Sequence, residues 1–288
     1  MKNIIDYIET GKNEFEQHPF FTQFLSNTDL PGEKRLSWAP STIPFMMGYA
    51  DLNTYVFRKE NLEGVADPIQ AILNAHTYEE DFHWQWFLRD LDKVNADTEM
   101  PLSDATRVLW GRGFEHSRRL LLELTSIAAQ LESYGLFTMM EAIEAISIVF
   151  FRSCQGITMQ NGEECEFFGT KHYIAESSHA INDPGFADLD LPALNDDERE
   201  KAQVIVDRVF RLFNDWVDSL LQYARNVDEH ALSYEQMIIQ SKRMGSAEPV
   251  SYFVCEGHEM ISKGKQHDQY DEHQEREDQS EGAQAIPG

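Results

Sequence analysis

The 288-residue sequence is short of cysteine, of positive charge and of long apolar runs, and each shortage argues against a class of protein. Its three cysteines share no Cys-x-x-Cys spacing, which argues against a disulfide framework or a thiolate zinc site and favours a reducing cytoplasm. Lys plus Arg number 24 against 50 for Asp plus Glu, and the formal charge of −26 argues against a nucleic-acid partner. No uninterrupted apolar run of about 18 residues occurs, so we expect no membrane-spanning segment.

The signature motifs of several common enzyme classes are missing as well. The chain has no Gly-x-Ser-x-Gly nucleophile elbow and no phosphate-binding Gly-x4-Gly-Lys-Ser/Thr loop. Gly111-Arg112-Gly113 has the first two glycines of a dinucleotide-binding pattern but lacks the third. The sequence therefore gives no support to a hydrolase with that elbow or to a nicotinamide-dependent enzyme.

Apolar residues at helical spacing occur along most of the chain, whereas alternating β-branched runs are scarce, so we predict an all-α protein. Asp67-Pro68 combines a capping carboxylate with proline at the first helical position. Asn195 and Glu198 have the spacing of a capping box, and His18-Pro19 is expected to interrupt the first helix. The predicted helices span residues 3–26, 41–60, 67–94, 103–134, 136–155, 164–179, 195–227 and 231–243.

The helix at 136–155 is apolar on nearly every side, which predicts that it lies at the centre of the fold. We expect one helical domain over residues 1–235 and a C-terminal extension over 236–262. Residues 263–288 form an acidic tail with almost nothing apolar after Tyr270, so this tail is expected to be disordered.

Two copies of a His-x3-Glu-x2-His pattern stand out among the ten histidines. At 100° per residue the three side chains of each copy project at about 0°, 40° and −20°, so they share one narrow stripe of a helix. Each helix therefore offers two imidazoles and a carboxylate to the same side, which is the ligand chemistry of dimetal carboxylate bundles. The copies are His76, Glu80 and His83, and His172, Glu176 and His179.

Glu144 is the candidate for a bridging carboxylate because it lies in an apolar helix, where an uncompensated charge would be expensive. With Glu80 and Glu176 it supplies three negative charges against the four of two divalent ions. Nitrogen and oxygen ligands without thiolate favour iron or manganese over zinc. Two neighbours compete for these roles: Glu79 with Glu80, and Glu141 with Glu144.

An alternative interpretation needs no metal. Helical His and Glu at these spacings also occur as exposed polar pairs, and Glu79, Glu80 and Asp81 could form an ordinary solvated acidic turn. His76 could be a direct ligand, a hydrogen-bond partner of a ligand, or a surface residue.

The sequence resembles the haem-oxygenase-like diiron oxidases over roughly residues 10 to 225. The His-x3-acid-x2-His element is the most specific part of the resemblance. The matching segments are His18-Pro19-Phe20-Phe21, 76–84, 87–91, Glu144-Ala145-Ile146 before Val149-Phe150-Phe151, and Phe167-Phe168-Gly169 before His172, Glu176 and His179.

The resemblance implies a seven-helix bundle with two Fe(II) ions, or a mixed manganese and iron pair, that uses O2 as co-substrate. It also implies an external electron donor such as a reductase, a homodimer, and a small substrate derived from an amino acid, an amine or a fatty acid, commonly in specialised metabolism. Catalysis would depend on Glu80, Glu144 and Glu176. Family members commonly have Asp where Glu176 stands. The implied metal ligands are Glu80, His83, Glu144, His172, Glu176 and His179, with His76, Glu79, Glu141 and Asp51 as further candidates.

Three alternatives remain at this stage. In a ferritin-like bundle Asp51 would supply a fourth carboxylate and His172 would be surplus. In a metal-independent, thiamine-related (TenA-like) hydrolase or small-molecule binder of the same fold, a cysteine such as Cys154 or Cys165 would act instead. In a scaffold protein the acidic tail would recruit a basic partner.

Overall fold

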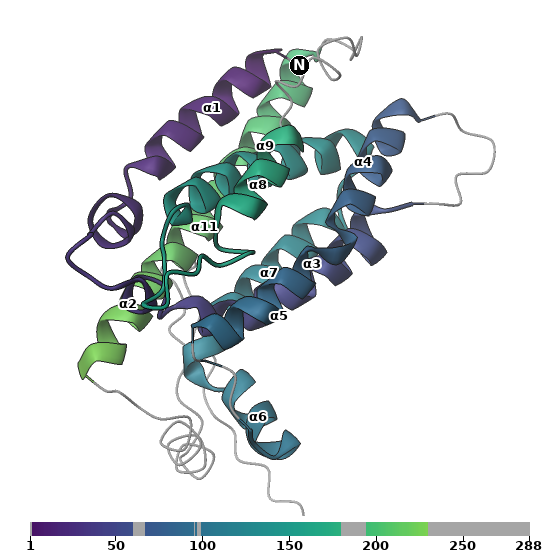
Figure 1. Ribbon diagram of the computed structural model, residues 1–288. Helices are drawn as coiled ribbons and strands as arrows, with labels where there is room; N and C mark the ends of the chain where they lie inside the picture. Colours follow the sequence, from purple (N-terminus) through teal and green to yellow (C-terminus); the bar gives the residue numbers. More distant parts are fainter. Residues whose placement is uncertain (1, 60–66, 95, 97–98, 180–193, 230–288) are drawn as a thin grey trace, which may run out of the picture. The chain divides into compact units, whose positions relative to one another are not determined.

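The computed structural model describes residues 2–59, 67–94, 96, 99–179 and 194–229 (Figure 1). These residues belong to one compact unit, 1–247. Within them the protein is all-α, as predicted, and β pairing is limited to an isolated bridge between Thr158 and Glu164. The helix predicted at 231–243, the C-terminal extension and the acidic tail lie outside the described residues.

The helical elements follow one another closely along the chain. They are α1 (Lys2–Glu16), the π-helix η1 (Phe20–Leu25), α2 (Gly32–Arg35), η2 (Ala39–Thr42), α3 (Ile43–Leu52), the π-helix η3 (Asn53–Phe57), α4 (Pro68–Glu79), η4 (Glu80–Phe82), α5 (His83–Lys93), α6 (Leu102–Leu109), η5 (Arg112–Phe114), α7 (Glu115–Ala128), α8 (Ser133–Cys154), α9 (Thr170–His179) and α11 (Asp196–Glu229).

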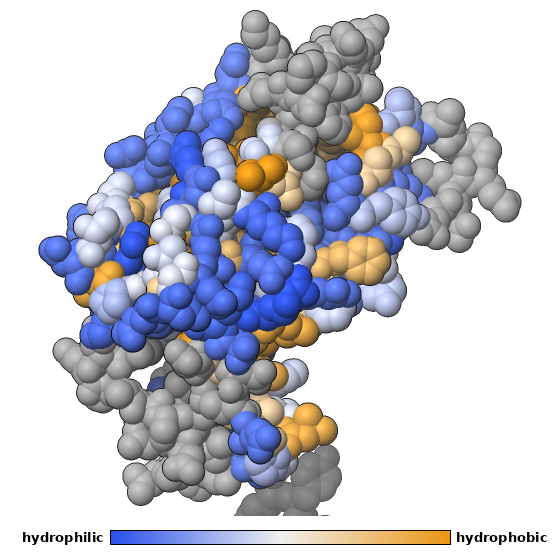
Figure 2. Space-filling view, in the orientation of Figure 1, coloured by the Kyte–Doolittle hydropathy of each residue, from blue (hydrophilic) through white to orange (hydrophobic). Residues whose placement is uncertain are grey.

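Helix α8 is the centre of the bundle, as its apolar sequence predicted. It packs against α1, α4, α9 and α11, and most of its side chains are buried (Figure 1). Among the described residues α8 is the one helix long and apolar enough to cross a membrane, but 78% of its apolar window is buried inside the protein. That burial is what a core helix requires. On the face shown in Figure 2, hydrophilic side chains predominate and hydrophobic ones appear in small groups.

Three helix ends were predicted correctly from local sequence. Asp67 accepts hydrogen bonds from the backbone N–H groups of residues 69 and 70 at the start of α4. Asn195 and Glu198 form a capping box, in which each side chain accepts from the other residue's backbone N–H at 2.9 Å. The first helix is interrupted at His18, whose Nδ1 accepts from the backbone N–H of Phe20 at 3.1 Å. His18 therefore shapes the turn before η1.

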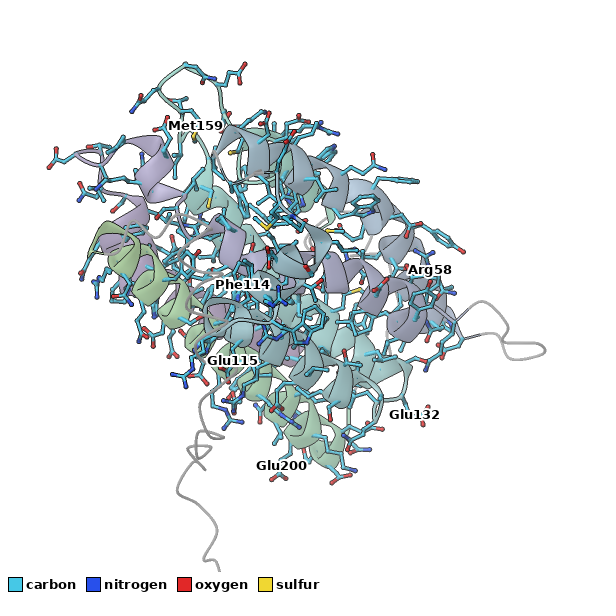
Figure 3. All side chains as sticks on the ribbon, turned by 90° about the horizontal axis from the view of Figure 1, so that it is seen from below. Arg58, Phe114, Glu115, Glu132, Met159 and Glu200 are labelled. Atoms are coloured by element: carbon cyan, nitrogen blue, oxygen red, sulfur yellow. The ribbon has the colours of Figure 1, made fainter. Side chains whose placement is uncertain are left out.

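Three predicted helices are shorter or more broken than expected. The segment 103–134 divides into α6 and α7 around Gly111–Gly113, and the last predicted helix begins at Thr170 instead of residue 164. The segment 67–94 is interrupted by the 3-10 turn η4. Arg58, labelled in Figure 3, donates to the carbonyl of Thr77 at 2.8 Å and to the carboxylate of Asp81 at 2.6 Å, which stabilises this tightened turn.

Candidate metal centre

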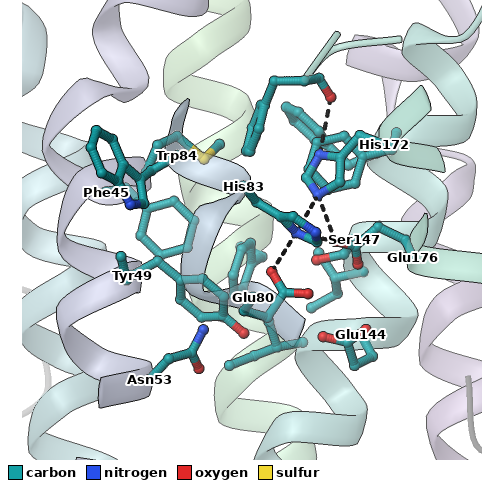
Figure 4. Close-up of a pocket in the computed structure, with 18 of the residues that line it drawn as sticks. Phe45, Tyr49, Asn53, Glu80, His83, Trp84, Glu144, Ser147, His172 and Glu176 are labelled. Carbon is teal, nitrogen blue, oxygen red and sulfur yellow. Dashed lines mark hydrogen bonds and ion pairs between the residues drawn. The ribbon is translucent and has the colours of Figure 1, made fainter. Parts of the chain in front are cut away.

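Four side chains from two distant parts of the sequence meet in one buried cluster at α5 and α9 (Figure 4). One ligand atom from each lies within 4.8 Å of the other three, and all four residues are buried. Glu80 comes from η4, His83 from the first turn of α5, and the remaining two from α9. We call Glu80, His83, His172 and Glu176 the four-residue cluster.

The ligand atoms of the cluster converge on one point. His83 Nδ1 lies 2.8 Å from a Glu80 oxygen and 3.1 Å from His172 Nε2. Glu176 Oε1 lies 2.8 Å from His172 Nε2 and 3.9 Å from His83 Nδ1. Two imidazole nitrogens and two carboxylate oxygens this close form a donor set suited to iron, manganese or zinc.

His172 is held so that one ring nitrogen faces the cluster. Its Nδ1 lies 3.1 Å from the carbonyl oxygen of Phe167, to which the Nδ1–H donates, and Nε2 is then the atom free to accept a proton or a cation. Asp90 fixes the segment that carries this carbonyl. Its carboxylate, fully buried, accepts hydrogen bonds from the backbone N–H groups of Glu166, Phe167 and Phe168 at 2.7, 2.7 and 2.9 Å.

Aromatic rings enclose both imidazoles. Trp86 stacks on His83 with ring centroids 4.5 Å apart and an interplanar angle of 21°. Phe151 and Phe167 lie against His172 with centroids 4.0 and 4.3 Å away. These rings exclude water and restrict the imidazoles to few orientations, which preorganises the cluster for a ligand.

A second polar group lies beside the four-residue cluster. His76 Nε2 is 3.1 Å from Glu144 Oε1, and both side chains are about 95% buried, with exposed fractions of 6% and 5%. Burial alone would lower the pKa of His76, but the carboxylate of Glu144, with smaller effects of Glu80 and Glu141, raises it to about 9. The other oxygen of Glu144, Oε2, is buried and has no hydrogen-bond partner within the described part of the chain. An ion beside it would supply that partner.

Several carboxylates lie close together in this region. Burial, followed by the charges of Glu144 and Glu80, raises the pKa of Glu176. Burial and the charge of Glu144 likewise raise the pKa of Glu141 to about 8. Since each raised pKa reports a carboxylate whose charge is unfavourable where it lies, a bound cation would relieve a cost already present in the fold.

The structure separates the predicted site residues into three sets. Glu80, His83, His172 and Glu176 come together, whereas the stripe expected to include His76 is broken by η4, so His76 pairs with Glu144 instead. Glu79 and Asp51 are exposed, which is contrary to a ligand role for either. Glu141 is half-buried near Glu144 and His76. His179 ends α9, but its side chain lies outside the described residues.

A pocket opens beside the cluster. Glu80, His83, Glu144, His172 and Glu176 line one part of it. The opposite wall carries aromatic side chains together with two polar residues, Tyr49 and Asn53, that the sequence analysis missed (Figure 4). The only signal in the sequence was their spacing of four residues in an apolar helix.

The metal-free protein is expected to lose stability as the pH rises from about 5 to about 9. Folding raises the pKa of Glu141 from 4.5 to about 8 and the pKa of His76 from 6.5 to about 9. The folded state therefore holds more protons than the unfolded state in this window. Each group then removes at most about 1.4 kcal/mol per pH unit. Urea unfolding in EDTA at a series of pH values measures this slope.

Two controls accompany that measurement. Glu141→Gln should flatten the part of the slope between pH 4.5 and 8, because it removes one of the buried groups whose pKa is raised. Saturating Mn²⁺ should also reduce the slope, since metal binding strengthens as the ligands lose their protons and so adds stability at the high-pH end of the window. A stability that stays level or rises across the window in EDTA would contradict the assignment of raised pKa values.

Comparison with known proteins adds no identification. The chain matches no protein-family model. It also matches no curated protein.

Proposed function

We propose that this chain is a non-haem dimetal oxidase with the haem-oxygenase-like seven-helix fold. The observation that carries the proposal is the four-residue cluster of two imidazoles and two carboxylates, buried within an all-α bundle and next to Glu144. Iron or manganese bound there would supply O2 activation, the chemistry that such N/O sites perform in dimetal bundles. The substrate would be a small molecule derived from an amino acid, an amine or a fatty acid.

The residues present fit two ions. The four-residue cluster would hold one, with Glu176 and Glu80 as its carboxylates. Glu144, whose Oε2 lacks a partner within the described residues, would hold the second ion, while its other oxygen stays paired with His76 Nε2. Glu80, Glu144 and Glu176 then balance three of the four positive charges. The aromatic walls keep water away from the reacting atoms.

His172 favours this fold over a ferritin-like bundle. It is surplus in the ferritin-like ligand scheme, yet its Nε2 lies within hydrogen-bond distance of both His83 and Glu176. Asp51, which the ferritin-like scheme needs, is exposed on α3.

A metal-independent hydrolase is less well supported. Burial raises the pKa of Cys154 well above its usual value, and burial with the charge of Asp90 does the same for Cys165. Thiols held protonated in this way are poor nucleophiles.

The reaction would be an N-oxygenation, a desaturation or an oxidative C–C cleavage. In the first two cases O2 accepts two electrons from the substrate and two from an external donor, with one or both oxygen atoms leaving as water. The protein's own contribution is to orient the substrate in the pocket, to hold the metal ligands and to exclude bulk water.

The test is anaerobic loading of the full chain with Fe(II), followed by a count of bound iron and measurement of O2 consumption with a reductant. We expect about two irons per chain and O2 uptake that the protein accelerates over free iron. A chain that binds neither Fe(II), Mn²⁺ nor Zn²⁺ at micromolar concentrations would refute the proposal.

A further inference from the structure

Tyr49 and Asn53 leave buried hydrogen-bonding atoms without a partner inside the pocket. The Tyr49 hydroxyl and both amide atoms of Asn53 are buried and make no hydrogen bond within the described part of the chain. Both residues line the pocket, and Figure 4 shows them on one wall with Glu80 and Glu144 facing them. Their spacing of four residues across the junction of α3 and η3 places them on the same side.

Two other buried polar side chains show how this fold satisfies such groups. Gln70, 1% exposed, donates to the carbonyl of Phe57 and to Asn74. Ser117, 2% exposed, donates to the carbonyl of Ser41 and accepts from the indole N–H of Trp216. Because folded proteins rarely leave such groups unpaired, a pair of them facing one cavity indicates a binding partner that enters the cavity.

The chemistry of this pair selects the partner. Tyr49 offers an O–H donor, and Asn53 offers both an N–H donor and a carbonyl acceptor. The residues that line the pocket include no Lys or Arg, so the wall formed by Tyr49 and Asn53 offers no charged partner to an anionic head. A planar neutral group that accepts two hydrogen bonds and donates one would satisfy the Tyr49 hydroxyl and both amide atoms of Asn53.

The rest of the pocket suits an apolar body. Its remaining walls are mostly aromatic, and Phe45, Phe150, Phe213 and Trp216 pack edge-to-face or stacked on one another. Burial of a hydrocarbon or aromatic group against such a surface is favourable, and the surface offers few polar contacts that could compete for the head.

We propose that Tyr49 and Asn53 bind a neutral carboxamide head of the substrate, whose apolar body then lies among these aromatic walls. The role of this ligand as a substrate oxidised at the four-residue cluster rests on the proposed function. Binding of the head needs only the pocket, so the two proposals can fail separately.

The probe is 3-phenylpropanamide, with its carboxylate counterpart 3-phenylpropanoate as the anionic comparison. Binding to the full chain is followed by quenching of tryptophan fluorescence, since Trp84 and Trp216 line the pocket. We expect the amide to bind wild type at least about tenfold more tightly than the carboxylate. Tyr49→Phe and Asn53→Leu should each weaken the amide by about tenfold, the usual effect of losing one buried hydrogen bond to a ligand.

The matched control is Tyr55→Phe. Tyr55 lies in η3 beside Asn53 but is 78% exposed, so its loss should leave the affinity unchanged. Thermal unfolding of each variant checks the fold, and Tyr49→Phe and Asn53→Leu should keep or raise the melting temperature because they remove unpaired buried groups. A melting temperature that is no lower than that of wild type is a second result that the proposal requires.

Two results would overturn the assignment: folded Tyr49→Phe and Asn53→Leu variants that bind the amide as wild type does, or a wild type that binds the amide no better than the carboxylate. Metal content measured on the same samples separates the two proposals. Amide binding that depends on Tyr49 and Asn53 in a chain that binds no metal refutes the oxidase alone. Metal binding without that dependence refutes the amide anchor alone.

Discussion

A Glu176→Gln variant is expected to lose tight binding of divalent ions while the metal-free protein keeps or gains stability. Glu176 Oε1 lies 2.8 Å from His172 Nε2 and 3.9 Å from His83 Nδ1, so it is central to the cluster. Glutamine has the same shape and can donate its N–H₂ group to Nε2 of His172, but it carries no charge to hold a cation. Since changes to residues behind the ligands cost 10 to 100-fold in metal affinity, removing a ligand should cost at least about 100-fold.

The expected gain in the metal-free state has a separate cause. Burial and the charges of Glu144 and Glu80 raise the pKa of Glu176, so its ionised form opposes folding at neutral pH. Replacing an uncompensated buried charge by a neutral isostere is neutral or stabilising. Stability without metal and affinity for metal should therefore change in opposite directions.

Metal titration at fixed pH and urea unfolding in EDTA measure the two effects. Glu123→Gln is the matched control, because Glu123 pairs with Arg208 at 3.1 Å on the partly exposed surface of α7. That change should alter stability by no more than about 1 kcal/mol and leave metal binding intact. Full metal loading in Glu176→Gln would show that the ion is held elsewhere.

The helices were predictable where a local signal fixes them. Asp67-Pro68 and the pair Asn195 and Glu198 supply the caps that the structure contains, and both depend only on residues within one turn. The apolar run 136–155 likewise identified the central helix, because a helix apolar on nearly every side has to be buried.

The break at η4 was not predictable in the same way. It depends on Arg58, which lies 19 residues before Thr77 in the sequence and donates a hydrogen bond to the Thr77 carbonyl. No periodicity within 67–94 reports such a contact. The break also explains why the uniform 100° rotation placed His76 with Glu80, although the two belong to different groups in the structure.

The candidate site divides along a similar line. The repeated His-x3-Glu-x2-His spacing indicated Glu80, His83, His172 and Glu176, because ligand chemistry leaves a pattern within one helix. The residues that support the ligands or line the pocket leave no such pattern. Tyr49 and Asn53 look like ordinary members of an apolar helix, and the role of Asp90 appears only when the segment before α9 folds over it.

Asp90→Asn is expected to destabilise the protein by about 3 kcal/mol or more. The carboxylate is fully buried and accepts three backbone N–H groups, of Glu166, Phe167 and Phe168. Burial raises the pKa of Asp90 even though these hydrogen bonds lower it, and the carboxylate's two oxygens still satisfy all three donors. An asparagine turns an N–H₂ group toward donors and leaves at least one of them unpaired. For a domain of this size the melting temperature should fall by roughly 6–12 °C.

The same change should also weaken metal binding, and this second effect identifies the positioning role of Asp90. The carbonyl of Phe167 orients His172 through Nδ1, so a displaced segment turns Nε2 away from the cluster. We expect metal affinity to fall by about 10 to 100-fold at a temperature where the variant is still folded. Asp92→Asn is the control, because Asp92 is exposed on the same helix and should change neither quantity. If Asp90→Asn lowered the melting temperature but bound metal as wild type does, Asp90 would support the fold without setting the orientation of His172. Since the metal titration uses only folded protein, loss of affinity there cannot come from unfolding and has to come from the geometry of the ligands.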